Sequence, residues 1–256
     1  MRRRTREDVN LPLMEHIMAL RKVLVISAYA IAIGTVIGWF VSDPAFAYLA
    51  SPVTRLKNIT FITTTPMEPI LVKLKLSMGI GVILALPVIM WQIWSFVLPA
   101  LKQNERKYLY MIVPSSVFLF LSGAALCFYL VMPIGVKFLL YVGAGGMLST
   151  PFVTKTSYLT FIFTFLVSFG IVFQLPIVLL ILIRIGVLSP KTLAKKRRWA
   201  ILIIIIVVAI VSPSPDLLTQ VLMAVPMYML FEVSIWLGYL VVRSREKQLT
   251  ASKGEV

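Results

Sequence analysis

Residues 94–110, WSFVLPALKQNERKYLY, join two long apolar runs of the chain. Each run is long enough to cross a bilayer as a helix, which takes about 20 apolar residues. Between them lie three cations and one carboxylate, Glu105. Apolar runs joined by short cationic loops are typical of polytopic membrane proteins. Glu105 either forms a local ion pair, for example with Lys102 three residues earlier, or receives a cation from another molecule.

The overall composition agrees with a membrane protein. Of the 256 residues, 59% are hydrophobic and 14% are charged, and the mean hydropathy is +0.94. A soluble domain carries roughly 25% charged residues, so this chain cannot cover a water-facing surface. Cys127 is the only cysteine, which excludes an intramolecular disulfide and a cysteine-based metal site.

The apolar runs predict an all-α integral membrane fold with six transmembrane helices in a single domain, residues 1–256. The predicted helices are 23–41, 70–97, 108–130, 158–183, 199–211 and 217–241. The fifth would rise only roughly 20 Å, against about 30 Å of hydrocarbon, and the prolines of SPSPD at 212–216 prevent its extension. The first run begins near Val23 and no cleavage site follows, so we predict a retained span and not a signal peptide.

The formal net charge of +15 fits nucleic acid or anionic lipid as a partner, or an excess of cations on cytoplasmic loops. The second interpretation is favoured because the cations gather in the amino-terminal segment, in every second loop and in the carboxyl-terminal tail. Both termini are therefore predicted to be cytoplasmic, and nucleic acid is not a predicted partner. The opposite loops, 43–70 and 143–158, are predicted to cap the outer face, with a short interfacial helix within residues 45–56.

Catalytic chemistry is not predicted. His16 is the only histidine, and the sequence holds no metal-ligand cluster, phosphate-binding loop or Ser-His pair within the spans. We therefore expect no enzyme, no metal and no cofactor. The function must therefore depend on the binding of a partner and on the shape of the protein.

Polar residues in or beside the spans are informative because burying them in lipid is costly. Gln174 either bonds to a neighbouring helix within the bundle or docks the helix of another protein. Asp216 is better explained as a helix N-cap, and Ser212 and Gln220 share its region. Glu232 is expected to pair with a loop cation. The aromatic residues Trp91, Trp94, Phe96 and Trp199 are predicted belt residues, and Phe96 has a groove-lining role as its alternative.

Five stretches together resemble the TatC family, the multispanning receptor of the twin-arginine protein translocase. They are PLMEHIMALRKVL at 12–24, TTTPMEPILVKLKLS at 63–77, WSFVLPALKQNERK at 94–107, FGIVFQLPIVL at 169–179 and SPSPDLLTQVLMAVPMYMLFE at 212–232. The resemblance covers nearly the whole chain in order and spacing. It implies a concave bundle of six helices in which the fifth and sixth are short.

The resemblance also implies a function and partners. Such proteins lie in the bacterial cytoplasmic (inner) membrane and bind the twin-arginine signal peptide of folded preproteins at the cytoplasmic face. Export is driven by the proton gradient with the single-span proteins TatA and TatB. Other copies of the chain and membrane lipid are further expected partners.

By position in the motifs, the resemblance assigns two sets of residues. The signal-peptide set is Glu105, Phe96, Pro99, Leu101, Leu20 and Arg21. The set for partner helices or transport is Gln174, Ser212, Asp216, Gln220, Glu68 and Pro52. The family's usual Glu-Leu-Arg motif reads Ala19-Leu20-Arg21 here, and Glu15, one helical turn earlier on the same face, is the predicted substitute for the missing carboxylate.

The alternative function is a small-solute secondary transporter. Such a protein needs ionisable residues facing each other near the midplane and often carries internal repeats. The centre of this chain offers mainly the uncharged Gln174, and the sequence has no internal repeat. An intramembrane enzyme would lack both its nucleophile and its base.

Overall fold

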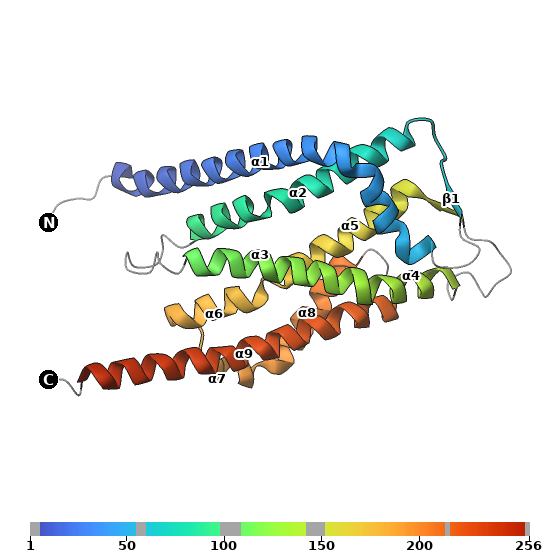
Figure 1. Ribbon diagram of the computed structural model, residues 1–256. Coiled ribbons are helices and arrows are strands. Elements are labelled where there is room, and N and C mark those ends of the chain that lie inside the picture. Colours follow the sequence, from blue (N-terminus) through green and yellow to red (C-terminus); the bar gives the residue numbers. More distant parts are fainter. Residues whose placement is uncertain (1–5, 55–59, 98–108, 142–151, 213–215, 254–256) are drawn as a thin grey trace. The chain divides into compact units, whose positions relative to one another are not determined.

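The computed structural model describes residues 6–54, 60–97, 109–141, 152–212 and 216–253. The chain divides into two compact units. Unit 1 comprises 1–49 and 66–117, and unit 2 comprises 50–65 and 118–256. Figure 1 labels their elements, and each unit is described by itself.

Unit 1 is built mainly from two long helices, α1 (Arg6–Thr54) and α2 (Glu68–Val97). The predicted first span, residues 23–41, lies within α1, which continues without interruption to Thr54 and whose last residues belong to unit 2. The helix predicted within 45–56 is thus the end of α1. Apolarity alone sets the limits of a predicted span, whereas helical hydrogen bonding also continues through alanine-rich and polar sequence.

Glycines let α1 and α2 approach each other closely. The two helices run antiparallel (Figure 1). A Cβ atom on Gly34 would lie 2.7 Å from the carbonyl oxygen of Gly81, and one on Gly38 would lie 2.6 Å from that of Ser77. Small residues on facing helices are a common means of association in membranes. Here they bring the two backbones into contact.

Trp94 anchors the middle of α3 (Leu109–Leu126) to the end of α2. Its side chain is only 5% exposed, and its Nε1–H donates to the hydroxyl of buried Ser116 over 2.7 Å. The predicted belt position of Trp94 is therefore wrong, because the indole finds its polar partner inside the protein and not at a headgroup. Trp91 is exposed and meets Tyr110 edge-on, with ring centroids 5.5 Å apart.

Unit 2 contains a small sheet that sequence reasoning did not predict. Strand β1 (Thr60–Ile62) pairs in parallel with β2 (Phe152–Thr154), with Phe61 opposite Val153. The sheet joins the two loops that were predicted to cap the outer face. Phe61 also contacts Tyr158 of α5 (Lys155–Val172), with ring centroids 5.3 Å apart.

The third predicted span is longer than expected and changes its helical pitch. After α3 the chain forms a π-helical segment, η3 (Cys127–Val131), and then α4 (Met132–Tyr141). Pro133 is the second residue of α4 and has no N–H to donate. A local π turn, in which Met132 N–H bonds to the Cys127 carbonyl, accommodates this loss.

The fourth predicted span is divided in two. Helix α5 ends at Val172 and α6 (Leu175–Ile185) follows after two residues, with Pro176 in its first turn. Next to this break, α3 and α5 interlock. The ring of Phe173 covers Gly123, and the ring of Phe120 covers Gly170.

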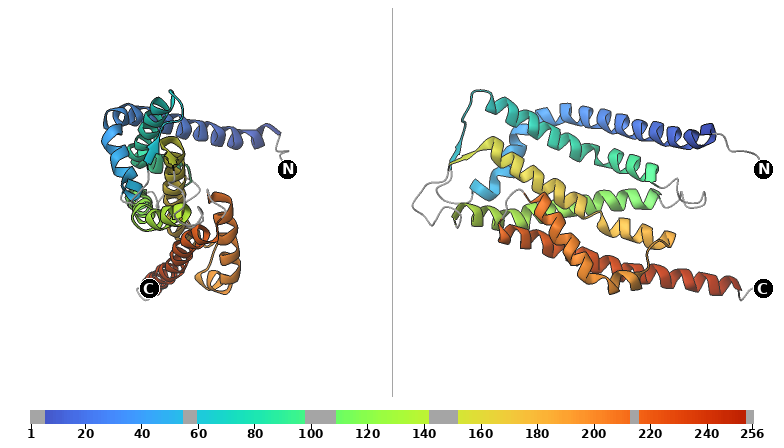
Figure 2. Two further views of the ribbon diagram at one scale, coloured as in Figure 1. Left: turned by 90° about the vertical axis from the view of Figure 1, so that its right-hand side faces the viewer. Right: turned by 180° about the vertical axis from the view of Figure 1, so that it is seen from behind.

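The carboxyl-terminal part of unit 2 contains a short helix and a long helix, which follow α6 after a small helical turn. Helix α6 ends at Gly186, whose positive φ of 91° suits a glycine C-cap. A single turn, α7 (Pro190–Lys195), leads to α8 (Arg197–Val211), which lies beside α9 (Leu217–Lys253) in Figures 1 and 2.

These helices test the predicted lengths. Helix α8 has 15 residues, which confirms the short fifth helix. Helix α9 has 37 residues, so the short sixth helix that the resemblance implied is wrong, because the polar residues after Val241 continue the helix.

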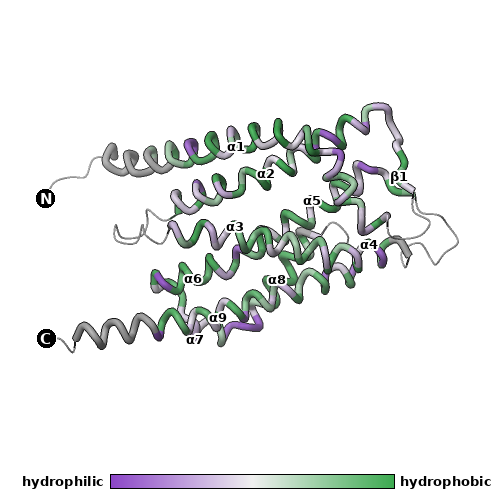
Figure 3. Tube along the Cα trace, viewed as in Figure 1, coloured by the Kyte–Doolittle hydropathy of each residue, from purple (hydrophilic) through white to green (hydrophobic). Residues whose placement is uncertain are grey.

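Five helices among the described residues are long and apolar enough to cross a membrane (Figure 3). They are Ile17–Thr54, Glu68–Val97, Tyr110–Leu139, Lys155–Ile185 and Leu217–Arg243. Helix α8 is shorter than these. The predicted fifth span, and with it the total of six spans, therefore stays a prediction.

Candidate functional site

The described members of the signal-peptide set lie at one end of unit 1. Leu20 and Arg21 are exposed on α1, and Phe96 is half-buried in the last turn of α2. Leu20 precedes the glycine crossing at Gly34 by about 21 Å of helix, and Phe96 follows Gly81 by a similar rise. Because α1 and α2 are antiparallel, these displacements have the same direction and bring the three residues to the same end (Figure 1).

Other members of this set are outside the described residues. Pro99, Leu101 and Glu105 fall between Val97, where α2 ends, and Leu109, where α3 begins. Glu15 lies on α1 four residues before the exposed Ala19, and its side chain is likewise outside the description. Their predicted roles stay predictions.

Most residues of the set for partner helices or transport lie at helix ends, and the set is distributed over both units. Gln174 is the N-cap residue of α6, and its carbonyl accepts from Val178 N–H over 3.1 Å. Ser212 is the C-cap residue of α8. Pro52 is half-buried near the end of α1, in unit 2, whereas Glu68 is buried at the start of α2, in unit 1.

Asp216 has the capping role that the sequence favoured. Its Oδ2 atom accepts from the backbone N–H of Thr219 over 2.7 Å, and its carbonyl accepts from Gln220 N–H over 3.1 Å. A carboxylate there also interacts favourably with the helix dipole. Asp216 therefore fixes the start of α9, and Gln220 sits one turn further along.

The predicted pairing of Glu232 with a loop cation is confirmed. The Arg197 guanidinium binds it with two nitrogens, Nε at 2.7 Å from Oε1 and an Nη at 2.8 Å from Oε2. The Tyr228 hydroxyl also donates to Oε1 over 2.7 Å. The Tyr228 contact was not predicted, although its spacing of four residues from Glu232 on one helix is a signal for it. This cluster ties the start of α8 to the middle of α9.

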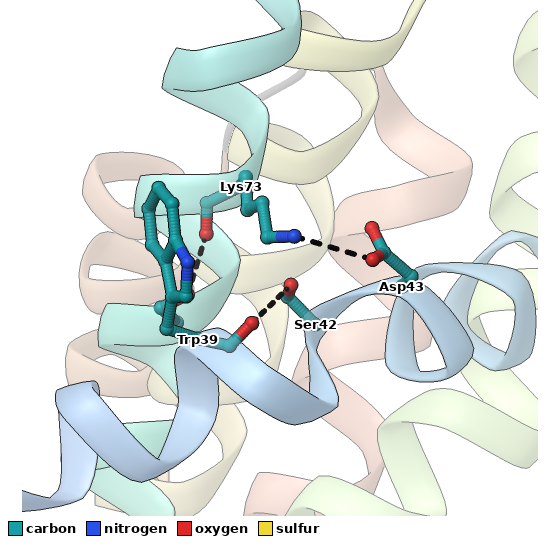
Figure 4. Close-up of polar contacts among 5 residues, drawn as sticks. Trp39, Ser42, Asp43 and Lys73 are labelled. Carbon is teal, nitrogen blue, oxygen red and sulfur yellow. Dashed lines mark hydrogen bonds and ion pairs between the residues drawn. The ribbon is translucent and has the colours of Figure 1, made fainter.

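A second polar cluster, which was not predicted, joins α1 to α2 in unit 1. Lys73 Nζ lies 3.2 Å from Asp43 Oδ2 and 5.2 Å from the centre of the Trp39 ring (Figure 4). Ser42 and Ser77 donate to backbone carbonyls beside it. A lysine in the second turn of an otherwise apolar helix is the sequence signal for such a cluster.

The arrangement supports binding better than catalysis. Among the described residues, no three His, Cys, Asp or Glu side chains gather as a metal-binding group. The polar groups described above cap helices, join them or lie exposed at their ends. Such groups can position a peptide or a helix.

Comparison with known proteins decides the family. Residues 15–226 match the family model TatC, Sec-independent protein translocase protein. The chain belongs to the TatC family. The TatC protein of Carboxydothermus hydrogenoformans is 42% identical over 91% of this chain and 94% of its own length. That of Aquifex aeolicus is 38% identical over 93% and 98%.

A solved structure is similar as well. The crystal structure of the twin-arginine translocase receptor TatC superposes with a TM-score of 0.77 and 38% identity, over 89% of this chain and 99% of that one. The predicted TatC resemblance is confirmed. As a TatC protein the chain is an integral membrane component of a protein translocase and not an enzyme, and the transporter alternative finds no support.

Proposed function

We propose that this TatC protein is the receptor subunit that binds twin-arginine signal peptides of folded preproteins at the cytoplasmic face of the inner membrane. The observation that carries the proposal is its similarity, over nearly all of both chains, to a structure described as a twin-arginine translocase receptor. The proposal includes six membrane spans, of which α8 is the fifth, and places both termini in the cytoplasm. Reporter fusions after Leu148 should report the outer side, and fusions after Lys196 or Lys253 the inner side.

The chemistry of the proposed site suits two arginines. A guanidinium is planar and can bind a carboxylate through two parallel hydrogen bonds, and Glu105 is the only carboxylate among the cations of its loop. Glu15 offers a second carboxylate where Ala19 lacks one. The apolar part of a signal peptide would lie near Phe96 and Leu20, while the surrounding cations repel unrelated basic segments.

The test is binding of a twin-arginine peptide to the purified protein at low salt, where charge is least screened. Glu105→Gln keeps the size and the hydrogen-bonding ability of the side chain but removes its charge, so binding should fall strongly. Glu15→Gln should weaken it less, unless Glu15 replaces the carboxylate absent at Ala19. Glu255→Gln removes the same charge from the carboxyl terminus and serves as the control.

Two results would contradict this site. One is a Glu105→Gln protein that binds the peptide as tightly as wild type. The other is equal binding of a peptide in which both arginines are replaced by lysine, since a lysine cannot make the two-point contact.

We further propose that single-span proteins of the TatA and TatB type dock beside α8, with the region of Gln174, Ser212 and Gln220 supplying polar contacts. A hydrogen bond gained there forms without competing water. Photocrosslinkers at Ile203 and Ile210, whose side chains are 57% and 79% exposed, should trap such a protein in membranes. Buried Ile204 on the same helix is the control position. Trapping only lipid or another copy of the chain would refute this docking face.

A further inference from the structure

The junction of α7 and α8 carries a dense group of cations. Residues 190–199, PKTLAKKRRW, include five cations and no carboxylate. In the hydropathy view, the chain turns hydrophilic where α7 meets α8 (Figure 3). We call Lys195, Lys196 and Arg198, with Lys191 beside them, the junction cations.

The backbone under the junction cations is held firmly against α9. The Ser189 hydroxyl caps α7 by accepting from Thr192 N–H over 3.1 Å. Buried Pro190 lies so close to Gly238 of α9 that a Cβ there would be 3.2 Å from its ring. After the first three of these cations, at the start of α8, Arg197 is bound to Glu232 of α9. The junction cations therefore stand on a fixed support, which lowers the entropy lost when they bind a ligand.

The junction cations are exposed, and their charge is not neutralised within the described part of the chain. Arg197 is the one cation of residues 190–199 for which the described residues supply an ion pair. Lys191, Lys195, Lys196 and Arg198 point into the surroundings. Their charges are thus available to a negatively charged partner.

Apolar side chains beside the cations indicate where that partner lies. Val187 in the turn before α7 and Trp199 after the cations are 67% and 65% exposed. Tryptophan and cations with apolar neighbours are typical of the headgroup level of a bilayer. A loop surrounded only by water would gain nothing from exposing Val187.

The length of α8 leads to the same level. Its apolar part, residues 199–211, rises about 20 Å, which is less than the roughly 30 Å of hydrocarbon. The cationic end of α8 is therefore drawn toward the lipid phosphates, because a short helix must thin the bilayer or bring its flanking residues to the headgroups.

We propose that the junction cations form a binding surface for anionic phospholipid headgroups, held against α9 by the Arg197–Glu232 contact. The phosphate oxygens would accept hydrogen bonds from Lys195, Lys196 and Arg198, while Trp199 and Val187 contact the upper acyl chains. An acidic protein segment would match the charge but not the apolar neighbours, so the lipid is favoured. The partner is a lipid such as phosphatidylglycerol.

The test counts phosphatidylglycerol molecules that stay bound to detergent-purified full-length protein in native mass spectrometry, with phosphatidylcholine as the neutral competitor. Each Lys or Arg near an anionic surface strengthens binding about fivefold, so Lys195→Gln/Lys196→Gln/Arg198→Gln should weaken it about 100-fold. The control Arg2→Gln/Arg3→Gln/Arg4→Gln removes the same charge elsewhere and should retain the lipid. Lys195→Arg/Lys196→Arg keeps the charge and should retain it too.

Three outcomes would overturn the proposal. The triple glutamine variant would hold phosphatidylglycerol as tightly as wild type. Phosphatidylcholine would bind the wild type as well as phosphatidylglycerol does. Or a polyglutamate peptide would bind the wild type more tightly than phosphatidylglycerol does and would lose that affinity in the triple variant, which would assign the surface to an acidic protein. Circular dichroism of each variant verifies that the helices are intact.

Discussion

Two antiparallel helix pairs, α1–α2 and α8–α9, are held together by different means. In the first pair the backbones touch through Gly34, Gly38 and Gly81. In the second, a two-point contact between Arg197 and Glu232 joins the helices. Direct backbone contact leaves no room for a larger side chain. The strength of an ion pair depends instead on the charges and on their exposure to solvent. The first pair carries the described residues of the predicted signal-peptide set, and the second carries the proposed docking and lipid surfaces.

The largest effect is expected from Gly34→Ala. The added Cβ would lie 2.7 Å from the Gly81 carbonyl oxygen and 2.9 Å from its Cα, so α1 must move away from α2. Overpacking of this kind costs about 3 kcal/mol of the free energy of unfolding, measurable by denaturation in detergent. Gly135→Ala is the control, because nothing lies within 4 Å of its added Cβ. Equal stability of the two variants would show that the glycine contact does not hold the pair.

A smaller loss is expected from Glu232→Gln. The amide cannot accept the charged two-point contact from Arg197, and hydrogen bonds to charged groups contribute about 1.5–3 kcal/mol. The Glu232 side chain is 31% exposed, so we expect the lower part of this range. Arg197→Lys keeps the charge but loses the fork and should lie between wild type and Glu232→Gln. An unchanged melting temperature for both variants would contradict a clamp at α8.

The smallest effect is expected from Asp43→Asn. This residue makes the ion pair of the α1–α2 hairpin with Lys73, but its side chain is 82% exposed. Exposed pairs contribute about 0–1 kcal/mol, and salt screens them. The loss should therefore vanish at high salt, whereas that of Glu232→Gln should persist in part. A loss for Asp43→Asn as large as that for Gly34→Ala would mean that charge, and not backbone contact, holds the first pair.

In the candidate sites, contacts between residues close in the sequence were predictable, whereas contacts between distant residues were not. Asp216 as an N-cap was predictable, because a cap bonds to a backbone N–H three residues away. The short α8 was predictable because the prolines after it stop any helix. The sequence indicated that the cation pairing with Glu232 comes from a loop, but not which residue it is, because Arg197 lies 35 residues away along the chain.

The sequence by itself determined that the chain is helical and membrane-bound, where its cations and prolines lie, and which family it belongs to. These properties follow from residue composition, spacing and contacts within one helical turn. The tertiary structure alone decided that Trp94 packs inside, that α1 continues past Val41, that the two loops predicted to cap the outer face pair as strands, and that Leu20, Arg21 and Phe96 share one end of unit 1. Hydropathy cannot distinguish these cases, because an apolar side chain gains as much against lipid as against another helix, and only the packed neighbours separate the two.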